Sequence, residues 1–321
     1  MKAVLQWLFD ALREDLGWPV KVRQLLATKE GVRVSLSEPA PCIRASSVTP
    51  WHRLAERGAL HWPPQRHGTL MGWKHSGGHY FSYEIHRPEY EQIGVKTVVK
   101  DWRCDVSDVH GFSSSKSDLS TFASTDAMVE QNSRAMISEI SPEKLDENLA
   151  HREIRILHSD GSDHFEYYQW DKRVWLMNDG GSHHLAAAKY IAARLNRRVP
   201  LQGALHSYSI DAQAIASLRR DFEMFVVPDD AEFANAFLDA MRGFKATWLW
   251  HEMPRHFEAT RAILLPRTEP RSMRVAEEFR RAGVVDLGEF LEDLAASQLP
   301  RINLSEHGSA PVAMHDAIAA Q

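Results

Sequence analysis

The fold is decided by residues 174–188, VWLMNDGGSHHLAAA. The apolar run 174–177 predicts a buried strand, and the alanine-rich run 185–195 predicts a helix. Two consecutive glycines stand between them, where they let the backbone turn sharply and let a ligand approach the main chain closely. Strand, glycine turn and helix in this order predict an α/β (α+β) protein whose functional centre is the turn at 178–184.

The start of the predicted helix is a candidate binding site for an anion. Helix N-termini present unpaired main-chain N–H groups and the positive end of the helix dipole, which together attract phosphate. Two histidines add side-chain donors at the same place, and each can carry a proton near neutral pH. The predicted phosphate- or nucleotide-binding residues are Gly180, Gly181, Ser182, His183 and His184.

The polar residues of the turn each have a structural alternative. Ser182 suits a helix N-cap better than a phosphate ligand, because serine is among the best N-capping residues. Asp179 is typical of a turn former bonded to the backbone, and its acid–base role is the less favoured interpretation. For His183 and His184 we favour anion contact or proton transfer over structural hydrogen bonding. The candidate catalytic residues are His183, the first choice, with His184 and Asp179.

Residues 136–210 predict one α+β core around this turn. The sequence Ser141-Pro142-Glu143 is a good helix start, because serine caps a helix and proline fits its first position. Three strand-like segments follow, the last two joined by a turn short enough for a hairpin, at 153–157, 164–170 and 173–177. A further strand is expected at 199–209, after the helix.

This arrangement resembles the ParB/sulfiredoxin-like superfamily over about residues 136–210. In that superfamily a Gly-x-x-Arg or Gly-Cys-His-Arg turn grips nucleotide phosphates, and residues 181–184 would occupy that turn. The resemblance implies phosphate binding, but its members include DNA clamps, small-molecule kinases and nucleases, so it does not select a reaction. Ser182 replaces the sulfiredoxin cysteine, so repair of an over-oxidised cysteine is not expected. His184 replaces the usual arginine, and histidine cannot make the same bidentate phosphate clamp.

Two further regions are expected on either side of this core. Residues 1–135 predict an N-terminal α+β region with an opening amphipathic helix and strands at 31–36, 80–85 and 94–99. A Ser-, Asp- and Thr-rich stretch at about 106–126 is typical of a mobile loop. Residues 211–321 predict a mainly helical C-terminal region, with helices at 212–220, 231–242, 271–282 and 287–295 and short strands at 222–227, 247–250 and 262–265.

Composition narrows the class of protein. Of the 321 residues, 44% are hydrophobic and 25% are charged, as in ordinary globular proteins. The longest apolar runs fall far short of the ~20 residues needed to cross a bilayer, and the first helix lacks the features of a secretory signal. The two cysteines, Cys42 and Cys104, form no CxxC pair, so we expect the protein to be located in the reducing cytoplasm. The net charge of −5 argues against a surface that binds nucleic acid all round.

Three other patterns are candidates for binding, and each also has a simpler interpretation. His75 and His79 flank a second glycine pair and are secondary candidates for a metal or pocket, although an ordinary turn is favoured. The polar run 158–164 offers donors for a divalent ion but is favoured as a solvated turn between strands. Residues 51–75 interleave basic groups with tryptophans, which suits single-stranded nucleic acid or a nucleotide base. The favoured alternative there is that the tryptophans belong to the core.

The leading hypothesis from the sequence is a phosphate- or nucleotide-binding ParB-like protein that catalyses phosphoryl transfer or phosphodiester hydrolysis. A nucleotide substrate would require Mg²⁺ to balance the phosphate charge, and the candidate carboxylates are Asp179 and Glu166. The first alternative is a non-enzymatic module that uses the fold as a scaffold and binds protein or nucleic acid through residues 51–75. The second alternative is a metal-dependent nuclease.

Overall fold

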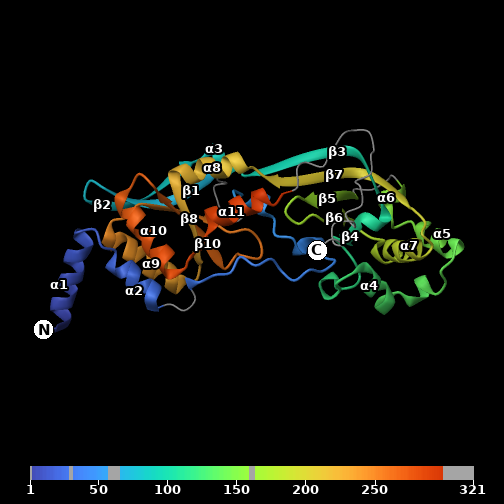
Figure 1. Cartoon of the computed structure of the whole chain (residues 1–321), viewed down its shortest axis with the longest axis horizontal. Helices are drawn as coiled ribbons and strands as arrows, with labels where there is room; N and C mark the ends of the chain where they lie inside the picture. The colour runs from blue at the N-terminus through green and yellow to red at the C-terminus, as the bar shows by residue number, and fades with distance from the viewer. Residues whose placement is uncertain (1, 29–31, 57–65, 159–162, 299–321) are drawn as a thin grey trace, which may run out of the picture. The chain divides into compact units, whose positions relative to one another are not determined.

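The computed structural model describes residues 2–28, 32–56, 66–158 and 163–298 (Figure 1). The chain forms two compact units, of which the first contains Met1–Ser37, Thr49–Val95 and Ile210–Ser297, and the second contains Glu38–Val48 and Lys96–Ser209. Each unit has its own sheet and helices, so the protein belongs to the mixed α+β class, as the sequence predicts. The units differ from the three predicted regions 1–135, 136–210 and 211–321, because strands far apart in the sequence pair within each unit.

The first unit is built on a six-stranded sheet in the order β11-β8-β10-β9-β1-β2. Neighbouring strands are antiparallel. They are β1 (Thr69–Ser76), β2 (His79–His86), β8 (Phe222–Pro228), β9 (Trp248–Glu252), β10 (Thr260–Pro266) and β11 (Val285–Asp286). The C-terminal region, predicted to be mainly helical with short strands at 222–227, 247–250 and 262–265, supplies β8 to β11. Strand β8 is buried on both faces.

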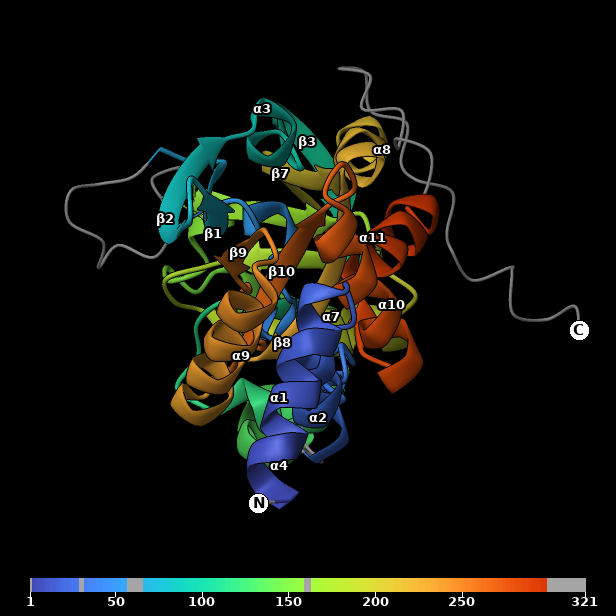
Figure 2. The ribbon, with the colours of Figure 1, turned by 90° about the vertical axis from the view of Figure 1, so that its left-hand side faces the viewer.

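The helices of this unit contact the sheet or one another. They are α1 (Lys2–Asp15), α2 (Val20–Thr28), α3 (Pro88–Glu91), α8 (Ala212–Asp221), α9 (Ala231–Phe244), α10 (Pro270–Ala282) and α11 (Leu287–Ala296). The core joins α2, α9 and α10 to β8 and β10, and Figure 2 shows these three helices in front of the sheet. At its centre the ring of Phe279 lies 5.1 Å from Phe225 and 5.9 Å from Phe237.

The second unit contains a five-stranded mixed sheet in the order β3-β7-β5-β6-β4. Its strands are β3 (Gly94–Asp105), β4 (Val109–Phe112), β5 (His164–Tyr168), β6 (Val174–Met177) and β7 (Pro200–Ile210). The predicted hairpin is present as the antiparallel pair β5 and β6, while β4 with β6 and β5 with β7 are parallel pairs. The end of β6 leads directly into the glycine turn.

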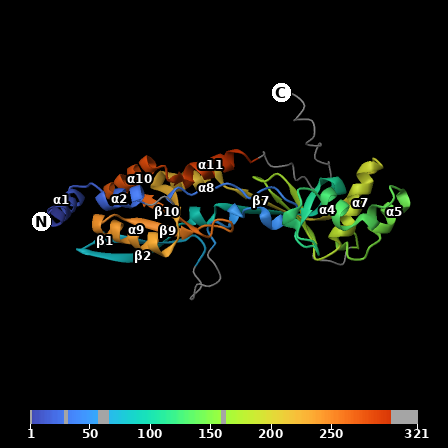
Figure 3. The ribbon, with the colours of Figure 1, turned by 90° about the horizontal axis from the view of Figure 1, so that it is seen from below.

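Helix α7 (Ser182–Arg194) is the centre of this unit. Its alanines at 186, 187 and 188 are fully buried, which lets neighbouring helices approach closely. Those neighbours are α4 (Thr125–Asn132) and α5 (Pro142–Leu149), and Figure 3 shows them on either side of α7. A short helical turn, α6 (Arg155–His158), precedes β5.

The stretch 106–126, predicted to be a mobile loop, contains several short regular elements joined by loop segments. It contains β4, the 3₁₀ turns η4 (Val106–Asp108) and η5 (Leu119–Thr121), and the start of α4. Its Ser and Asp residues act as caps: the side chain of Asp105 caps η4, Asp118 caps η5 and Ser124 caps α4. The polar composition that indicated disorder therefore reflects capping of short elements.

Two predicted strands are absent from the described residues. Residues 153–157 fold around α6, because a short apolar run does not by itself distinguish a strand from a helical turn. Residues 32–36 keep the predicted alternation, with Val32 buried and Arg33 exposed, but no neighbouring strand pairs with them. Within the described ranges, every helix is too short or too polar to span a bilayer.

Candidate functional site

The glycine turn between β6 and α7 depends on Gly181. This residue has a φ of 72°, a left-handed conformation that glycine adopts without strain. A Cβ at Gly181 would lie 2.6 Å from the carbonyl oxygen of Glu153, so a larger residue would collide with main chain. A Cβ at Gly180 would first meet the Glu153 side chain, at 3.4 Å. The turn therefore requires glycine at 181, whereas position 180 has room for a methyl group.

Asn178 ties this turn to the loop that follows β4. Its side chain is buried, and its Nδ2 donates to the carbonyl oxygens of Ser114 (3.1 Å) and Gly180 (2.8 Å). Its main-chain N–H donates to Ser113 Oγ at 2.8 Å, and that hydroxyl donates to Asn178 O at 3.0 Å. Residues 113–117 are thereby held beside the start of α7. The sequence does not reveal this role, because a polar residue before two glycines is typical of any turn.

The first amides of α7 have no acceptor among the residues that the structure describes. Gly181 occupies the N-cap position and has no side chain that could accept from the N–H groups after it. In the described part of the chain, the N–H groups of Ser182, His183 and His184 make no hydrogen bond, and the first helical bond is Leu185 N–H to Gly181 O at 2.9 Å. The alternative in which Ser182 caps the helix is wrong, because Ser182 is already the first helical residue.

An open cleft of about 610 Å³ lies at this end of α7. It is lined by the loop 114–117, by residues 132, 133 and 136 at and after the end of α4, by residues 151, 153 and 155, and by the turn 179–184. All the predicted residues of the turn therefore face one cavity. Its fixed charges are mixed, with Lys116 and Arg155 against Glu153 and Asp179, and the serine hydroxyls at 114, 115 and 117 add neutral donors.

His183 has a partner at each ring nitrogen. Its Nε2 lies 3.1 Å from Ser117 Oγ and its Nδ1 lies 2.5 Å from Ser133 Oγ. Asn132 Nδ2 donates to the same Ser117 hydroxyl at 2.7 Å. Burial, followed by the nearby charge of Lys116, lowers the pKa of His183, so its ring is neutral at pH 7. With both nitrogens engaged, His183 holds the loop 114–117, the serine loop, in place.

His184 has a fixed tautomer and an open ring nitrogen. Asn148 donates through Nδ2 to the carbonyls of Met136 and Lys144, at 2.9 Å each, so its Oδ1 can only accept. His184 Nδ1 lies 3.2 Å from that Oδ1 and therefore carries the proton, which leaves Nε2 as a lone pair. No described residue hydrogen-bonds to this Nε2. The geometry thus favours His184 for proton transfer over His183, the first choice from the sequence.

The surroundings of His184 keep its ring neutral. The ring of His151 stacks on it with centroids 3.7 Å apart and planes 12° apart. Burial, and then repulsion from His151, lowers the pKa of His184. At pH 7 its Nε2 can therefore accept a proton from a water or hydroxyl group in the cleft.

The two candidate carboxylates have different positions. Asp179 lines the cleft, where Arg155 Nη1 donates to it at 2.9 Å, and its main-chain N–H donates to Asp163 Oδ1 at 3.2 Å. Glu166 does not line the cleft: it is buried on β5, and its carboxylate accepts from the hydroxyls of Tyr168 and Tyr208. Glu153, which has no ion pair among the described residues, is a cleft carboxylate that the sequence did not single out.

The secondary candidates His75 and His79 do not line this cleft. They flank the two-residue turn of the β1–β2 hairpin, in the first unit, and both side chains are exposed. Glycines 77 and 78 have φ values of 57° and 83°, as expected for an ordinary tight hairpin turn. Of the polar run 158–164, residues 159–162 lie outside the described residues.

Residues 51–75 show no row of exposed aromatic rings in their described part. Trp51 is fully buried and stacks on Phe257 at 5.3 Å, and Trp73 is half-buried against Tyr80. Arg53 pairs with Glu56, and Arg66 Nη2 pairs with Glu91 at 3.2 Å, so these basic groups are partly neutralised. Trp62 and Arg57 lie outside the described residues. The observed burial favours the core interpretation of this segment over a nucleic-acid surface.

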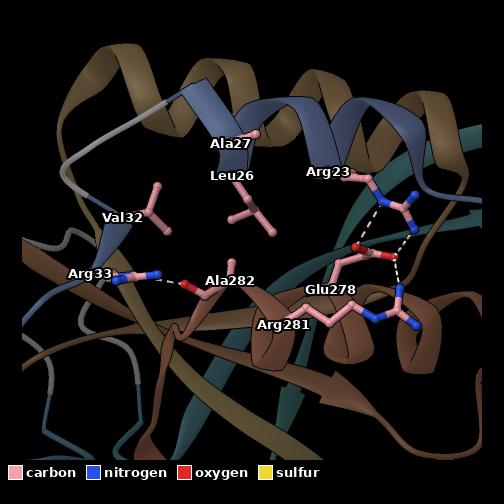
Figure 4. Close-up of a pocket in the computed structure, with 8 residues that line it drawn as sticks. All are labelled: Arg23, Leu26, Ala27, Val32, Arg33, Glu278, Arg281 and Ala282. Atoms are coloured by element: carbon pink, nitrogen blue, oxygen red, sulfur yellow. Dashed lines mark hydrogen bonds and ion pairs between the residues drawn. The ribbon is translucent and has the colours of Figure 1, made fainter.

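A second cavity of about 520 Å³ lies in the first unit between α2 and α10 (Figure 4). Glu278 stands between Arg23 and Arg281 and accepts from both, with Nη2 of Arg23 and Nη1 of Arg281 each at 2.6 Å from Oε1. The Arg33 side chain donates to the carbonyl of Ala282 at 3.1 Å. Because these charged groups already have partners, this cavity is a weaker candidate than the cleft at α7.

Comparison with protein families places the chain in a family. Residues 99–303 match the model of DUF6685, a family of unknown function. No curated protein and no solved structure shows significant similarity to the chain. The matched range contains every residue that lines the cleft at α7.

Proposed function

We propose that this chain, which belongs to the DUF6685 family of unknown function, binds a phosphate-bearing ligand such as a nucleotide at the start of α7. The observation that carries the proposal is that the N–H groups of residues 182–184, which line an open cleft, have no acceptor among the described residues. Such a helix end attracts anions through both its amides and its dipole. The resemblance of residues 136–210 to the ParB/sulfiredoxin-like superfamily supports the same ligand and stays a prediction.

The cleft has the size and donors that a nucleotide would need. Its volume of about 610 Å³ is within the ~300–1,000 Å³ range of small-molecule pockets. Lys116 extends from the serine loop without an ion pair in the described residues, so its ammonium group is available to a second phosphate oxygen. The hydroxyls of the same loop can donate to further oxygens.

The proposed reaction is phosphodiester hydrolysis or phosphoryl transfer. His184 Nε2 would accept the proton of the attacking water or hydroxyl, which suits a neutral imidazole with one open nitrogen. The amides at 182–184 would stabilise the negative charge that builds on the phosphoryl oxygens. If the ligand is a nucleotide, Mg²⁺ would neutralise its phosphates, and Glu153 and Asp179 are the carboxylates in the cleft that could hold it.

Calorimetric titration with inorganic phosphate, AMP, ADP and ATP, with and without Mg²⁺, tests this proposal. We expect saturable binding of at least one of them. The variant Lys116→Ala should weaken it by about tenfold, the effect of losing one charge-assisted hydrogen bond. His79→Ala, on the exposed hairpin, is the matched control and should leave binding unchanged. If the folded protein binds none of these ligands, the proposal is refuted and the non-enzymatic module becomes the better reading.

A cytoplasmic location is part of the proposal. Cys42 and Cys104 are both free and buried, a state that suits a reducing compartment. Nucleotides and Mg²⁺ are also available there.

A further inference from the structure

Three potential metal ligands meet on two adjacent interior strands of the second unit's sheet. Strands β5 and β7 are parallel neighbours in which Glu166 is paired with His206. His164 lies two residues before Glu166, so the pleat places it on the same face. The intervening Phe165 and Leu205 point to the opposite face, into the core around α7. The sequence separates His164 from His206 by the whole of β6 and α7, so only the fold shows that they are neighbours.

The geometry of the three groups is close to that of a metal centre. One ligand atom from each residue lies within 4.8 Å of the other two. His164 Nε2 is 3.8 Å from Glu166 Oε1, and the two imidazole rings have centroids 4.3 Å apart. Ligands at ~2.1 Å from a tetrahedral metal are about 3.4 Å apart, so small side-chain rotations would bring all three into coordination.

The carboxylate is already oriented by neighbouring groups. Glu166 Oε1 accepts from the Tyr208 hydroxyl at 3.2 Å, and Oε2 accepts from the Tyr168 hydroxyl at 2.5 Å. These two phenol rings stack on each other with centroids 5.2 Å apart. Hydrogen bonds of this kind fix the direction of a metal-binding carboxylate. Lys96 lies over the ring of Tyr208, 5.7 Å from its centroid. Its positive charge would repel a metal ion bound nearby.

We propose that His164, Glu166 and His206 bind a divalent first-row transition metal such as Zn²⁺, Mn²⁺ or Fe²⁺. Two imidazoles and one carboxylate favour these ions over Mg²⁺ and Ca²⁺, which prefer oxygen ligands alone. The histidines are half-buried, so water can fill the remaining coordination positions. None of the three residues lines the cleft at α7, so this site does not depend on phosphate binding there.

Titration of the chelator-treated full chain with Co²⁺, followed by its visible d–d absorption, tests the site directly. We expect one equivalent of Co²⁺ to give d–d bands and one equivalent of Zn²⁺ to displace it. His206→Ala and His164→Ala should each weaken Co²⁺ binding by at least tenfold, because each removes one of three protein ligands. Circular dichroism of the metal-free variants checks that they are folded. If His206→Ala is not folded, His206→Asn replaces it in the titration.

Adventitious binding by exposed histidines is the main competing explanation, since the chain has 17 histidines. The double variant His75→Ala/His79→Ala removes two exposed histidines from the first unit and should keep the full spectrum. The proposal is overturned if the wild-type protein gives no d–d bands. It is also overturned if the hairpin variant loses them while the folded His206 variants keep them.

Discussion

Two glycine turns with almost the same residues have different surroundings in this protein. Residues 75–79 read HSGGH and residues 180–184 read GGSHH. In the hairpin, a Cβ on either glycine would meet nothing within 4 Å. In the turn before α7, a Cβ on Gly181 would strike the main chain of Glu153. The hairpin glycines are needed only for the local backbone conformation, whereas Gly181 also permits close packing against another segment.

The histidines of the two turns differ in the same way. His75 and His79 pair with neighbouring strand residues and remain exposed. His183 and His184 are half-buried, and the side chains of Ser117, Ser133 and Asn148 hydrogen-bond to three of their four ring nitrogens. A motif of glycines and histidines therefore becomes a candidate site only where distant segments fix the rings and leave amides unpaired.

The largest effect is expected from Gly181→Ala. The substitution combines a left-handed φ of 72° with a contact of 2.6 Å to the Glu153 carbonyl oxygen, so we expect a loss of about 3 kcal/mol in the free energy of unfolding. Urea unfolding of the full chain, followed by circular dichroism, measures it.

Gly78→Ala is the matched control for this substitution. Gly78 has a φ of 83°, similar to that of Gly181, but open space around its Cβ position, so backbone strain alone should cost about 1 kcal/mol. Gly180→Ala should cost less than about 1 kcal/mol, because its first Cβ contact is at 3.4 Å. Equal losses for Gly181→Ala and Gly78→Ala would show that the packing against Glu153 is unimportant.

Asn178→Ala should have the next largest effect. It leaves the buried carbonyls of Ser114 and Gly180 without their side-chain donor, so we expect about 2 kcal/mol of destabilisation in the same urea assay. Ser76→Ala is the comparison in the hairpin, where the exposed side chain should contribute less than about 0.5 kcal/mol. If Asn178→Ala lowered the free energy of unfolding no more than Ser76→Ala does, the role of Asn178 in holding the turn to the loop after β4 would be contradicted.

Local structure around the site could be predicted from the sequence, and its long-range contacts could not. Alanine content and the glycine pair located α7 and its first residues to within a few positions, because helix propensity and turn conformation are local properties. The Asn178 side chain donates to Ser114, 64 residues earlier in the chain. The polar composition around Ser114 had indicated a mobile loop. The preference of His184 over His183 depends on Asn148, 36 residues away, whose amide fixes the tautomer.

The same limit applies to the first region. For the interleaved tryptophans and arginines at 51–75 the sequence favoured a core role but left a binding surface open, because sequence spacing does not show burial. Trp51 packs on Phe257, more than 200 residues later, and only the folded core reveals that contact. Conversely, β4 was missed because an edge strand of four residues carries too little periodicity to be recognised.

The pH dependence of ligand binding gives a smaller, more specific effect. The pKa of His184 is lowered in the free protein by burial and by His151, and a phosphate bound beside Nε2 should raise it. Between those two pKa values the complex holds one more proton than the free protein, so affinity should increase as the pH falls from 7.5 toward the pKa of the free protein. The gradient should not exceed about tenfold per pH unit, the limit for one proton.

Calorimetry of phosphate binding in two buffers with different ionisation enthalpies measures this proton uptake. His184→Gln keeps a polar group but cannot be protonated, so its binding should show no uptake and a flat pH profile. Uptake that persists in this variant would assign the proton to another group and remove His184 from the proposed mechanism.

The smallest effects are expected from His75→Ala and His79→Ala. Both side chains are exposed at the tip of the β1–β2 hairpin, so each variant should keep its free energy of unfolding within about 0.5 kcal/mol. Neither residue lines the cleft at α7, so the affinity for phosphate should also be unchanged within the error of calorimetry. If either substitution abolished phosphate binding, the ligand would be held at the hairpin, and unpaired helix amides would not be what separates a binding turn from a structural one.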